Sequence, residues 1–375
     1  MRVTAVDHSE SKPEMHAMRR SGGWLVAFLL ASCTHSEPFG SGNIPANGPP
    51  GTGSPLRLTL NPGQNRDPAW LRDQSGIQYS FQQAADPDLD YCLGVLPPAG
   101  GTRLAEKCYP GDPSGQSTDA LTNPAPGPGG RLAWVEAHSP VGSLSPITRT
   151  IRTGSLAVTD SGQVAITLPY VASSGQLHGT AIDLAWIGSD TLVYVGAEAL
   201  IGSVCNGCKK DTLVTGRDIV LLDLKDPTHT PNVVPGTTSA SSVWPSADGT
   251  AIYYTLGGDT KVYRRSLALG AVSVVADLDT LGITRDVSVQ DSVLLAVAGG
   301  LVSYNVNPVF DRLQGDSGGV LIRLDLRAGG PVALGDTFHY YRRPRLSPDR
   351  RFVVTEGTDR KTGLQIATLW LITLP

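Results

Sequence analysis

A recurring unit constrains the fold of this chain more than any other feature of its sequence. In each copy a large apolar residue is followed by a polar turn and then by a short strand rich in β-branched and aromatic residues. The clearest copies pair Trp70 with a strand at 77–80, Trp186 with 192–195, Trp244 with 252–255 and Leu346 with 352–355. Small sheets that cannot bury both faces alone must stack on their neighbours. The repeat therefore predicts a closed ring of similar sheets.

Two weaker copies fill the gaps, one starting at Arg131 without its apolar first half and one pairing Val289 with a strand at 293–297. Third strands follow at 218–224, 261–267, 320–326 and 368–374, and the alternation at 261–267 suits a strand with one buried face. The last of them needs an outer neighbour, which we expect residues 56–60 to supply. We therefore expect an all-β six-bladed β-propeller of four-stranded antiparallel blades over residues 56–375. A β-sandwich or a pair of barrels is the alternative.

Two turns of the repeat carry a family resemblance. Pro-Ser-Ala-Asp-Gly at 245–249 and Ser-Pro-Asp-Arg at 347–350 each precede a strand and resemble the WD40-like repeat of TolB-like propellers. The resemblance implies the propeller fold and a non-catalytic platform that binds a protein or peptide in the cell envelope. An enzyme and a passive envelope scaffold remain the alternatives, because one fold can serve many functions.

Residues 1–33 have the pattern of an export signal. Two arginines precede a short apolar run at 24–31, and residues 30–33 are Leu-Ala-Ser-Cys. The run is shorter than the roughly 20 residues that span a bilayer, and its flanks are those of a secretory signal. Residues 30–33 resemble the lipobox of bacterial lipoproteins, which implies cleavage before Cys33 and a lipid on its thiol. An ordinary signal peptide with an incidental cysteine, or a buried core helix, is the alternative.

Residues 34–55 consist almost wholly of Gly, Pro, Ser, Asn and Thr and predict a disordered tether. Residues 1–14 are polar, unlike the start of a signal, so Met15 and Met18 are alternative translation starts. Thr34 after the cysteine implies the outer membrane by the sorting rule of enterobacterial lipoproteins. We expect an exported monomer, attached to the cell envelope by lipid.

The five cysteines divide into Cys33 and two pairs. Cys92 and Cys108 are equidistant from Gly100, so a hairpin turning there would place them within reach of a disulfide. Cys205 and Cys208 lack a second ligand pair for zinc and a following histidine for haem attachment, and we predict a second disulfide. Both suit an oxidising compartment. No metal and no cofactor is expected.

Charged residues predict where a ligand binds. The 30 basic and 34 acidic side chains nearly balance, which argues against a nucleic-acid partner. Residues three and four positions before each apolar lead residue should surround the mouth of the central channel, where arginine suits a carboxylate or phosphate. The predicted binding residues are Arg66, Asp67, Asp183, Arg285, Asp286, Arg342 and Arg343. The alternative is that these charges pair across blades and only hold the ring together.

One motif imitates a catalytic site. Gly-Asp-Ser-Gly-Gly at 315–319 is identical to the nucleophile segment of trypsin-like serine proteases, and His138, Asp218 and Ser317 follow the order of its triad. The amino-terminal Ile-Val-Gly-Gly of that family and the cysteine before its nucleophile loop are missing. We therefore expect no catalytic residue. A serine hydrolase using this triad, or an unrecognised enzyme site at the channel mouth, is the alternative function.

Overall fold

The computed structural model describes residues 55–61, 63–82, 91–109, 117–140, 148–157, 159–172, 175–197, 199–201, 212–214, 217–299, 318–327, 329–336, 338–359 and 367–375. All of them belong to one compact unit, residues 41–375. The predicted lipidation site Cys33, the pair Cys205 and Cys208, and Ser317 lie outside the described residues.

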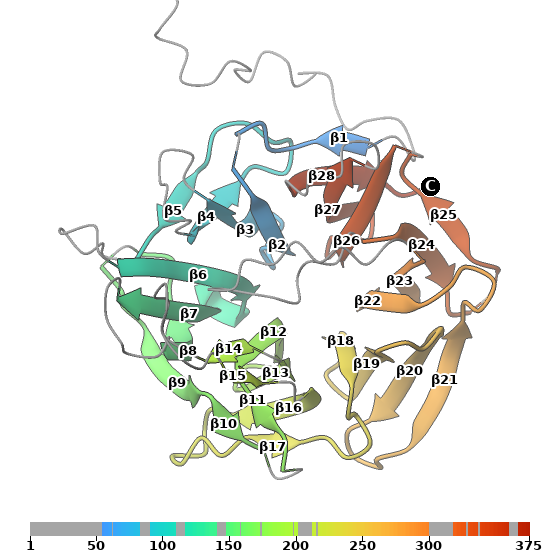
Figure 1. Ribbon diagram of the computed structural model, residues 1–375. Helices are drawn as coiled ribbons and strands as arrows, with labels where there is room; N and C mark the ends of the chain where they lie inside the picture. Colours follow the sequence, from blue (N-terminus) through green and yellow to red (C-terminus); the bar gives the residue numbers. More distant parts are fainter. Residues whose placement is uncertain are drawn as a thin grey trace, which may run out of the picture. The chain divides into compact units, whose positions relative to one another are not determined.

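The described chain is all-β, and its antiparallel sheets are arranged radially as a β-propeller, with one strand of each sheet innermost (Figure 1). We call the central region that these innermost strands surround the channel. Four sheets have four strands each. From the channel outward, the first contains β12 (Thr180–Ile187), β13 (Thr191–Ala197), β16 (Asp218–Asp223) and β17 (Asn232–Val233). The second contains β18 (Ala240–Pro245), β19 (Ala251–Leu256), β20 (Lys261–Ser266) and β21 (Val272–Asp277). The third contains β22 (Thr284–Gln290), β23 (Val293–Ala298), β24 (Val320–Asp325) and β25 (Val332–Leu334). The fourth contains β26 (His339–Leu346), β27 (Phe352–Asp359), β28 (Thr368–Thr373) and β1 (Pro55–Arg57).

An eight-stranded sheet consists of two antiparallel runs. The first run is β2 (Asn65–Trp70), β3 (Ile77–Gln82), β4 (Tyr91–Leu96) and β5 (Ala105–Lys107). The second is β6 (Ser117–Pro126), β7 (Leu132–Pro140), β8 (Thr148–Gly154) and β9 (Gln163–Leu168). A single parallel pair, Tyr91 and Ala120, joins the two runs.

Minor elements complete the described chain. Two small hairpins are β10 (Tyr170–Val171) with β11 (Leu177–His178) and β14 (Ala199–Ile201) with β15 (Thr212–Val214), and η2 (Pro128–Gly130) is a single 3₁₀ turn. Among the described residues, none lies in a helix with the length and apolar character needed to cross a bilayer.

The two ends of the propeller meet in one sheet. Strand β1 pairs with β28, with Leu56 opposite Leu371. Beyond β1, the Leu58 amide donates to the Leu369 carbonyl at 2.7 Å, and the Leu58 side chain is buried. The prediction that a segment near residue 56 completes the last sheet is confirmed.

The second strands predicted from the repeat are present as β3, β7, β13, β19, β23 and β27. The prediction that the unit at Arg131 lacks its first half is wrong, because β6 precedes β7 and pairs with it. Pro126 lies opposite Leu132, in the register in which Trp70 lies opposite Ile77. Proline is tolerated there because an inner strand is a sheet edge and need not donate every backbone hydrogen bond.

Apolar side chains fill the spaces between neighbouring sheets. Trp186 and Leu192, for example, pack with Ala125 and Ile151 of the preceding run. Similar clusters lie between each of the other sheets. Full burial of one large apolar side chain contributes about 1.5–3 kcal/mol, so these contacts stack the sheets into the ring.

The disulfide between Cys92 and Cys108 is confirmed. The pairing of β4 with β5 places Leu93 opposite Lys107, so the two cysteines lie in adjacent positions across the hairpin. Their Cα atoms are 4.4 Å apart.

Candidate functional site

Every described inner strand has a β-bulge or similar register shift before its lead residue. The register shifts between Arg66 and Ala69 in β2, and at equivalent places in β6, β12, β18, β22 and β26. Four bulge residues have positive φ, namely Asp67 (55°), Asn123 (49°), Asp183 (52°) and Arg343 (47°). A bulge re-aims a side chain, and Asp and Asn tolerate this conformation better than most residues. The position three residues before each lead residue therefore lies in the bulge.

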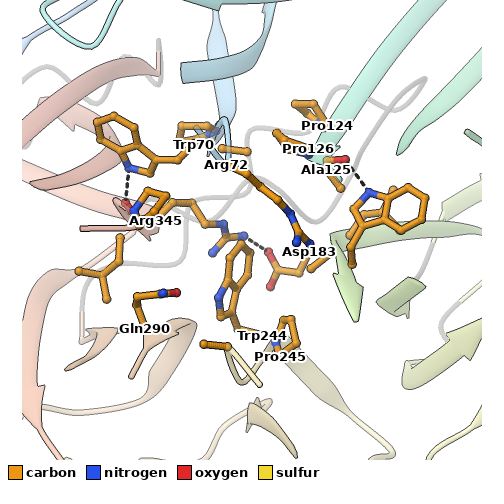
Figure 2. Close-up of a pocket in the computed structure, with 18 of the residues that line it drawn as sticks. Trp70, Arg72, Pro124, Ala125, Pro126, Asp183, Trp244, Pro245, Gln290 and Arg345 are labelled. Atoms are coloured by element: carbon orange, nitrogen blue, oxygen red, sulfur yellow. Dashed lines mark hydrogen bonds and ion pairs between the residues drawn. The ribbon is translucent and has the colours of Figure 1, made fainter. Parts of the chain in front are cut away.

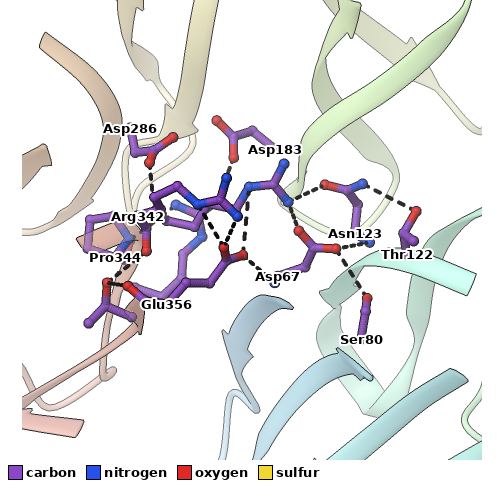
Figure 3. Close-up of polar contacts among 12 residues, drawn as sticks. Asp67, Ser80, Thr122, Asn123, Asp183, Asp286, Arg342, Pro344 and Glu356 are labelled. Atoms are coloured by element: carbon purple, nitrogen blue, oxygen red, sulfur yellow. Dashed lines mark hydrogen bonds and ion pairs between the residues drawn. The ribbon is translucent and has the colours of Figure 1, made fainter. Parts of the chain in front are cut away.

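Figure 3 shows that several bulge side chains meet in one polar cluster, which we call the channel network. The Arg343 guanidinium forms an ion pair with Asp67 and donates to the side-chain oxygen of Asn123, Oδ1, at 3.1 Å. The second Asp67 oxygen accepts from Ser80 at 3.2 Å and from the Asn123 amide at 3.1 Å. Since these residues come from β26, β2, β3 and β6, the contacts tie neighbouring sheets together.

Glu356 of β27 is the fully buried acid of the channel network. It accepts from Arg342 Nη2 at 2.6 Å and from the Asp67 amide at 2.7 Å. Burial alone would raise the pKa of Glu356, but the guanidinium groups of Arg342, Arg343 and Arg66 offset this effect and hold that pKa below its ordinary value. The carboxylate is therefore charged, and it forms its ion pair and hydrogen bonds with residues of the fold itself.

A second ion pair crosses the channel. Arg345 Nη2 lies 2.7 Å from Asp183 Oδ1, and both side chains are buried. Strands β26 and β12, which carry them, lie on opposite sides of the ring (Figure 1). The Arg345 guanidinium also stacks over the Trp244 ring, 4.3 Å from its centroid. This pair bridges the channel.

Hydrogen bonds from backbone amides to side chains repeat around the channel. The Val287 amide donates to Ser242 Oγ at 2.8 Å, and the Arg343 amide donates to Asp286 Oδ2 at 2.7 Å. Each such bond joins an inner strand to the inner strand of the next sheet. Buried polar groups need partners of this kind, so the bonds stabilise the closed ring.

The structure brings most of the predicted binding residues together. Asp67, Asp183, Asp286, Arg342 and Arg343 surround the channel and contact one another or neighbouring strands, as described above. Arg285 instead donates to the Gly299 carbonyl at 3.0 Å, and Arg66 lies 5.9 Å from the Tyr91 ring centroid.

A cavity of about 380 Å³ lies at the end of the channel where inner strands turn into second strands (Figure 2). We call it the turn-side cavity. Of the predicted residues, Asp67, Asp183 and Arg343 line it. Its volume is at the lower end of the ~300–1,000 Å³ found for small-ligand sites, so it has room for a group the size of one or two amino-acid residues.

Indole and proline rings form much of the wall of the turn-side cavity. The indole N–H groups of Trp70 and Trp186 donate to the carbonyls of Arg345 (3.0 Å) and Ala125 (2.8 Å). Trp244 is only half-buried. The lining prolines are Pro68, Pro124, Pro126, Pro245 and Pro348. Because proline fixes φ and hydrogen bonds fix two of the indoles, the wall is rigid.

Arg72 differs from the other charged residues of this cavity. It lies in the exposed turn between β2 and β3, and its side chain reaches into the cavity (Figure 2). Among the described residues, it has no hydrogen-bond or ion-pair partner. Its neighbour Asp73 accepts instead from the Ser75 hydroxyl at 2.7 Å, and this bond lowers the pKa of Asp73. Arg72 therefore offers a free cation to a ligand.

Asp248, on the opposite rim of the cavity, already has hydrogen-bond partners. Asp248 accepts from the Ser246 hydroxyl at 2.6 Å and from both the amide and the hydroxyl of Thr250. These hydrogen bonds, that of Ser246 foremost, lower the pKa of Asp248 to about 2. Asp248 is therefore ionised and held within its own turn.

Sequence reasoning missed several residues of this site: Arg72, Asn123, Trp244 as a cavity wall, Arg345 and Glu356. Asn123 was missed because β6 was not recognised as an inner strand. The position of Arg72, two residues after Trp70 in the turn of a repeat, was a usable signal. Glu356 lies in a second strand, and nothing in the repeat pattern distinguishes it.

Two residues of the protease-like triad, Asp218 and His138, contact other side chains. Asp218 Oδ2 lies 3.0 Å from Nε2 of His178, and both side chains are buried. His138 lies in β7 and stacks on Tyr109 with ring centroids 5.4 Å apart. The histidine that pairs with Asp218 is therefore not the one that the protease order requires.

Comparison with known proteins identifies the fold alone. No protein-family model matches the sequence, and no curated protein does. A gluconolactonase from Xanthomonas campestris is similar in structure at 14% identity, with a TM-score of 0.51 over 86% of this chain and 89% of that one. A luciferin-regenerating enzyme matches at 12% identity and a TM-score of 0.50, over 85% and 95%. TolB from Acinetobacter baumannii matches at 15% identity and a TM-score of 0.48, over 80% and 64%. The β-propeller neighbours thus include enzymes as well as TolB.

Proposed function

We propose that this protein is a non-catalytic platform that binds a protein segment or peptide in the turn-side cavity. The observation that carries the proposal is the composition of this cavity: rigid indole and proline rings beside Arg72, a guanidinium that has no hydrogen-bond or ion-pair partner among the described residues. Rings of this kind suit an extended peptide, and Trp and Arg are the residues most often dominant in protein recognition. The ionised groups of the channel network are engaged with one another, which supports binding rather than chemistry.

The proposal includes six blades. The eight-stranded sheet contains two antiparallel runs that share only the pair Tyr91 and Ala120. Each run has its own bulged inner strand, β2 or β6. Counted as two blades, these runs and the four four-stranded sheets give six.

The proposal also includes a place in the cell. The signal-like residues 1–33 and the lipobox-like residues 30–33 support an exported lipoprotein, attached through Cys33 to the outer membrane by the tether 34–55. The disulfide between Cys92 and Cys108 supports an oxidising compartment.

Peptide binding is tested with a synthetic library of random short peptides that have free termini. The mature protein is immobilised, and retained peptides are identified by mass spectrometry. We expect a related subset to be retained, and we expect Trp244→Ala to abolish retention. Arg264→Ala is the matched surface control, because Arg264 lies on β20 outside the cavity lining. Equal retention by wild type and Trp244→Ala would contradict the proposal.

The location is tested with an alkyne-labelled fatty acid fed to cells that express the protein. We expect the label on the wild-type protein in the outer-membrane fraction. Cys33→Ser should remove the label and release the protein from the membrane. A labelled Cys33→Ser variant, or an unlabelled wild type, would contradict the lipid attachment.

A further inference from the structure

We infer that the turn-side cavity recognises a carboxylate joined to a flat apolar group, as at the C-terminus of a peptide that ends in an aromatic residue. This inference names the ligand chemistry of the proposed function and rests on it.

The charge of the cavity lining carries the inference. Six acidic or basic side chains among the described residues line the cavity: Asp67, Asp183, Asp248, Arg72, Arg343 and Arg345. The three acids are engaged by Arg343, Arg345 and the Ser246–Thr250 turn, respectively. The lining thus holds three acids and three cations, and the donors to Asp248 are uncharged. Among the described residues that line the cavity, Arg72 is the cation without a hydrogen-bond or ion-pair partner. A ligand carboxylate that pairs with Arg72 therefore gains a charge-assisted contact without displacing one that the fold already makes.

The geometry of Arg72 favours a carboxylate. A guanidinium presents paired N–H donors that match both oxygens of a carboxylate, and it stays charged at physiological pH. The turn that carries Arg72 is fixed by the hydrogen bond from the Leu71 amide to the Gly76 carbonyl, at 2.9 Å, and by the Asp73–Ser75 contact. A fixed turn limits the entropy lost when the guanidinium binds.

The flat apolar group follows from the rings beside Arg72. Trp244 is half-buried, and Arg345 lies over its ring. Pro245 and Pro126 line the same cavity (Figure 2). Aromatic rings pack well on such surfaces in offset or edge-to-face arrangements. The volume of about 380 Å³ leaves room for one aromatic residue and its backbone.

The Gln290 amide supplies a further contact. Gln290 lines the cavity at the end of β22, and among the described residues it has no hydrogen-bond partner for its side chain. A carboxamide can donate and accept. It therefore suits the peptide bond that precedes a terminal carboxylate.

The experiment is a calorimetric titration of the mature protein with four probes. They are an acetylated tripeptide ending in phenylalanine as the free acid, the same peptide as the C-terminal amide, an amidated peptide with an internal glutamate, and N-acetylphenylalanine. We expect the free acid to bind about ten-fold or more tightly than the amide, as one charge-assisted contact implies. Arg72→Gln should remove that difference, Arg72→Lys should keep part of it, and Arg264→Ala should leave it unchanged.

The outcomes distinguish a failure of the carboxylate inference from a failure of the proposed peptide binding. Equal binding of the acid and the amide would overturn the carboxylate inference and leave peptide binding intact. Binding of N-acetylphenylalanine but not of either peptide would support the carboxylate and overturn the peptide platform. Preference for the internal glutamate would overturn the assignment to a C-terminus. If no probe binds, the carboxylate inference fails, and the library retention decides the platform.

Discussion

Arg345 and Asp183 form a buried ion pair across the channel, although they are 162 residues apart in sequence and belong to sheets on opposite sides of the ring. Neighbouring sheets are already joined by apolar clusters. This pair adds a direct contact between sheets that are not neighbours, and both of its residues line the turn-side cavity.

Removal of Arg345 should therefore be costly. Arg345→Met leaves the Asp183 carboxylate buried without its counter-ion, and breaking a buried pair in this way costs about 3–5 kcal/mol. Urea unfolding measures the change. Arg327→Met, which breaks the exposed pair with Asp291, is the control and should cost at most about 1 kcal/mol. Combining Arg345→Met with Asp183→Asn should cost less than the sum of the single changes, and strict additivity would disprove the coupling.

The buried Glu356 predicts how stability depends on pH. Its folded-state pKa lies below the ordinary value, so it stabilises the fold above the unfolded-state pKa of about 4.3, and this contribution is lost as pH falls through the folded-state pKa. The free energy of unfolding should therefore begin to fall as the pH drops to about 4.3 and continue to fall until the pH has passed the lower folded-state pKa. Glu356→Gln should be less stable at neutral pH and show a shallower decline. If the free energy of unfolding of Glu356→Gln depends on pH as steeply as that of the wild type, Glu356 is not a source of this pH dependence.

The disulfide should stabilise the fold through the unfolded state. Cys92 and Cys108 are separated by 16 positions, and closing a loop of that size contributes about 3 kcal/mol. The Cys92→Ser/Cys108→Ser double variant should have a free energy of unfolding lower by about that amount, and hence a lower urea midpoint. Reducing agent should lower the urea midpoint of the wild type to that of the double variant and leave the midpoint of the double variant unchanged. A lower midpoint of the double variant in reducing agent would indicate another disulfide.

The enzymatic alternative has a direct test. A fluorophosphonate probe labels serine residues activated by a general base. Because Asp218 pairs with His178 rather than His138, we expect no labelling at Ser317. Ser317→Ala should give the same signal as the wild type. Labelling that disappears in Ser317→Ala would establish a serine hydrolase and overturn the proposed function.

The fold was largely predictable because each repeat contains strand and turn patterns that can be recognised from a few neighbouring residues. Second strands with β-branched and aromatic residues, such as 252–255, are apparent from the sequence, and so is the turn at 245–249. The inner strand β6 was missed because its residues Thr122–Pro126 combine Asn and two prolines, which locally predict a turn. Burial beside the channel overrides that local preference.

The site was only partly predictable. Counting back from the lead residues located Asp67, Asp183 and Arg343, because each of these bulge residues lies three positions before its lead residue. The same count cannot show that Arg343 pairs with Asp67 whereas Arg72 has no partner in the described part of the chain, since those pairings depend on the closure of the whole ring. Glu356 enters the channel network from another strand for the same reason.

The shared sheet of β1 and β28 has a consequence for assembly. Thr59 and Leu369, which are 310 residues apart, are joined by a hydrogen bond where the two strands meet. Contacts of such sequence separation are slow to form. Because a chain is synthesised from its N-terminus, β1 is made early and has an unpaired edge until β28 follows. During that interval the edge is open to strands of other chains, so the time needed to complete the chain sets how long the protein is exposed to misassembly.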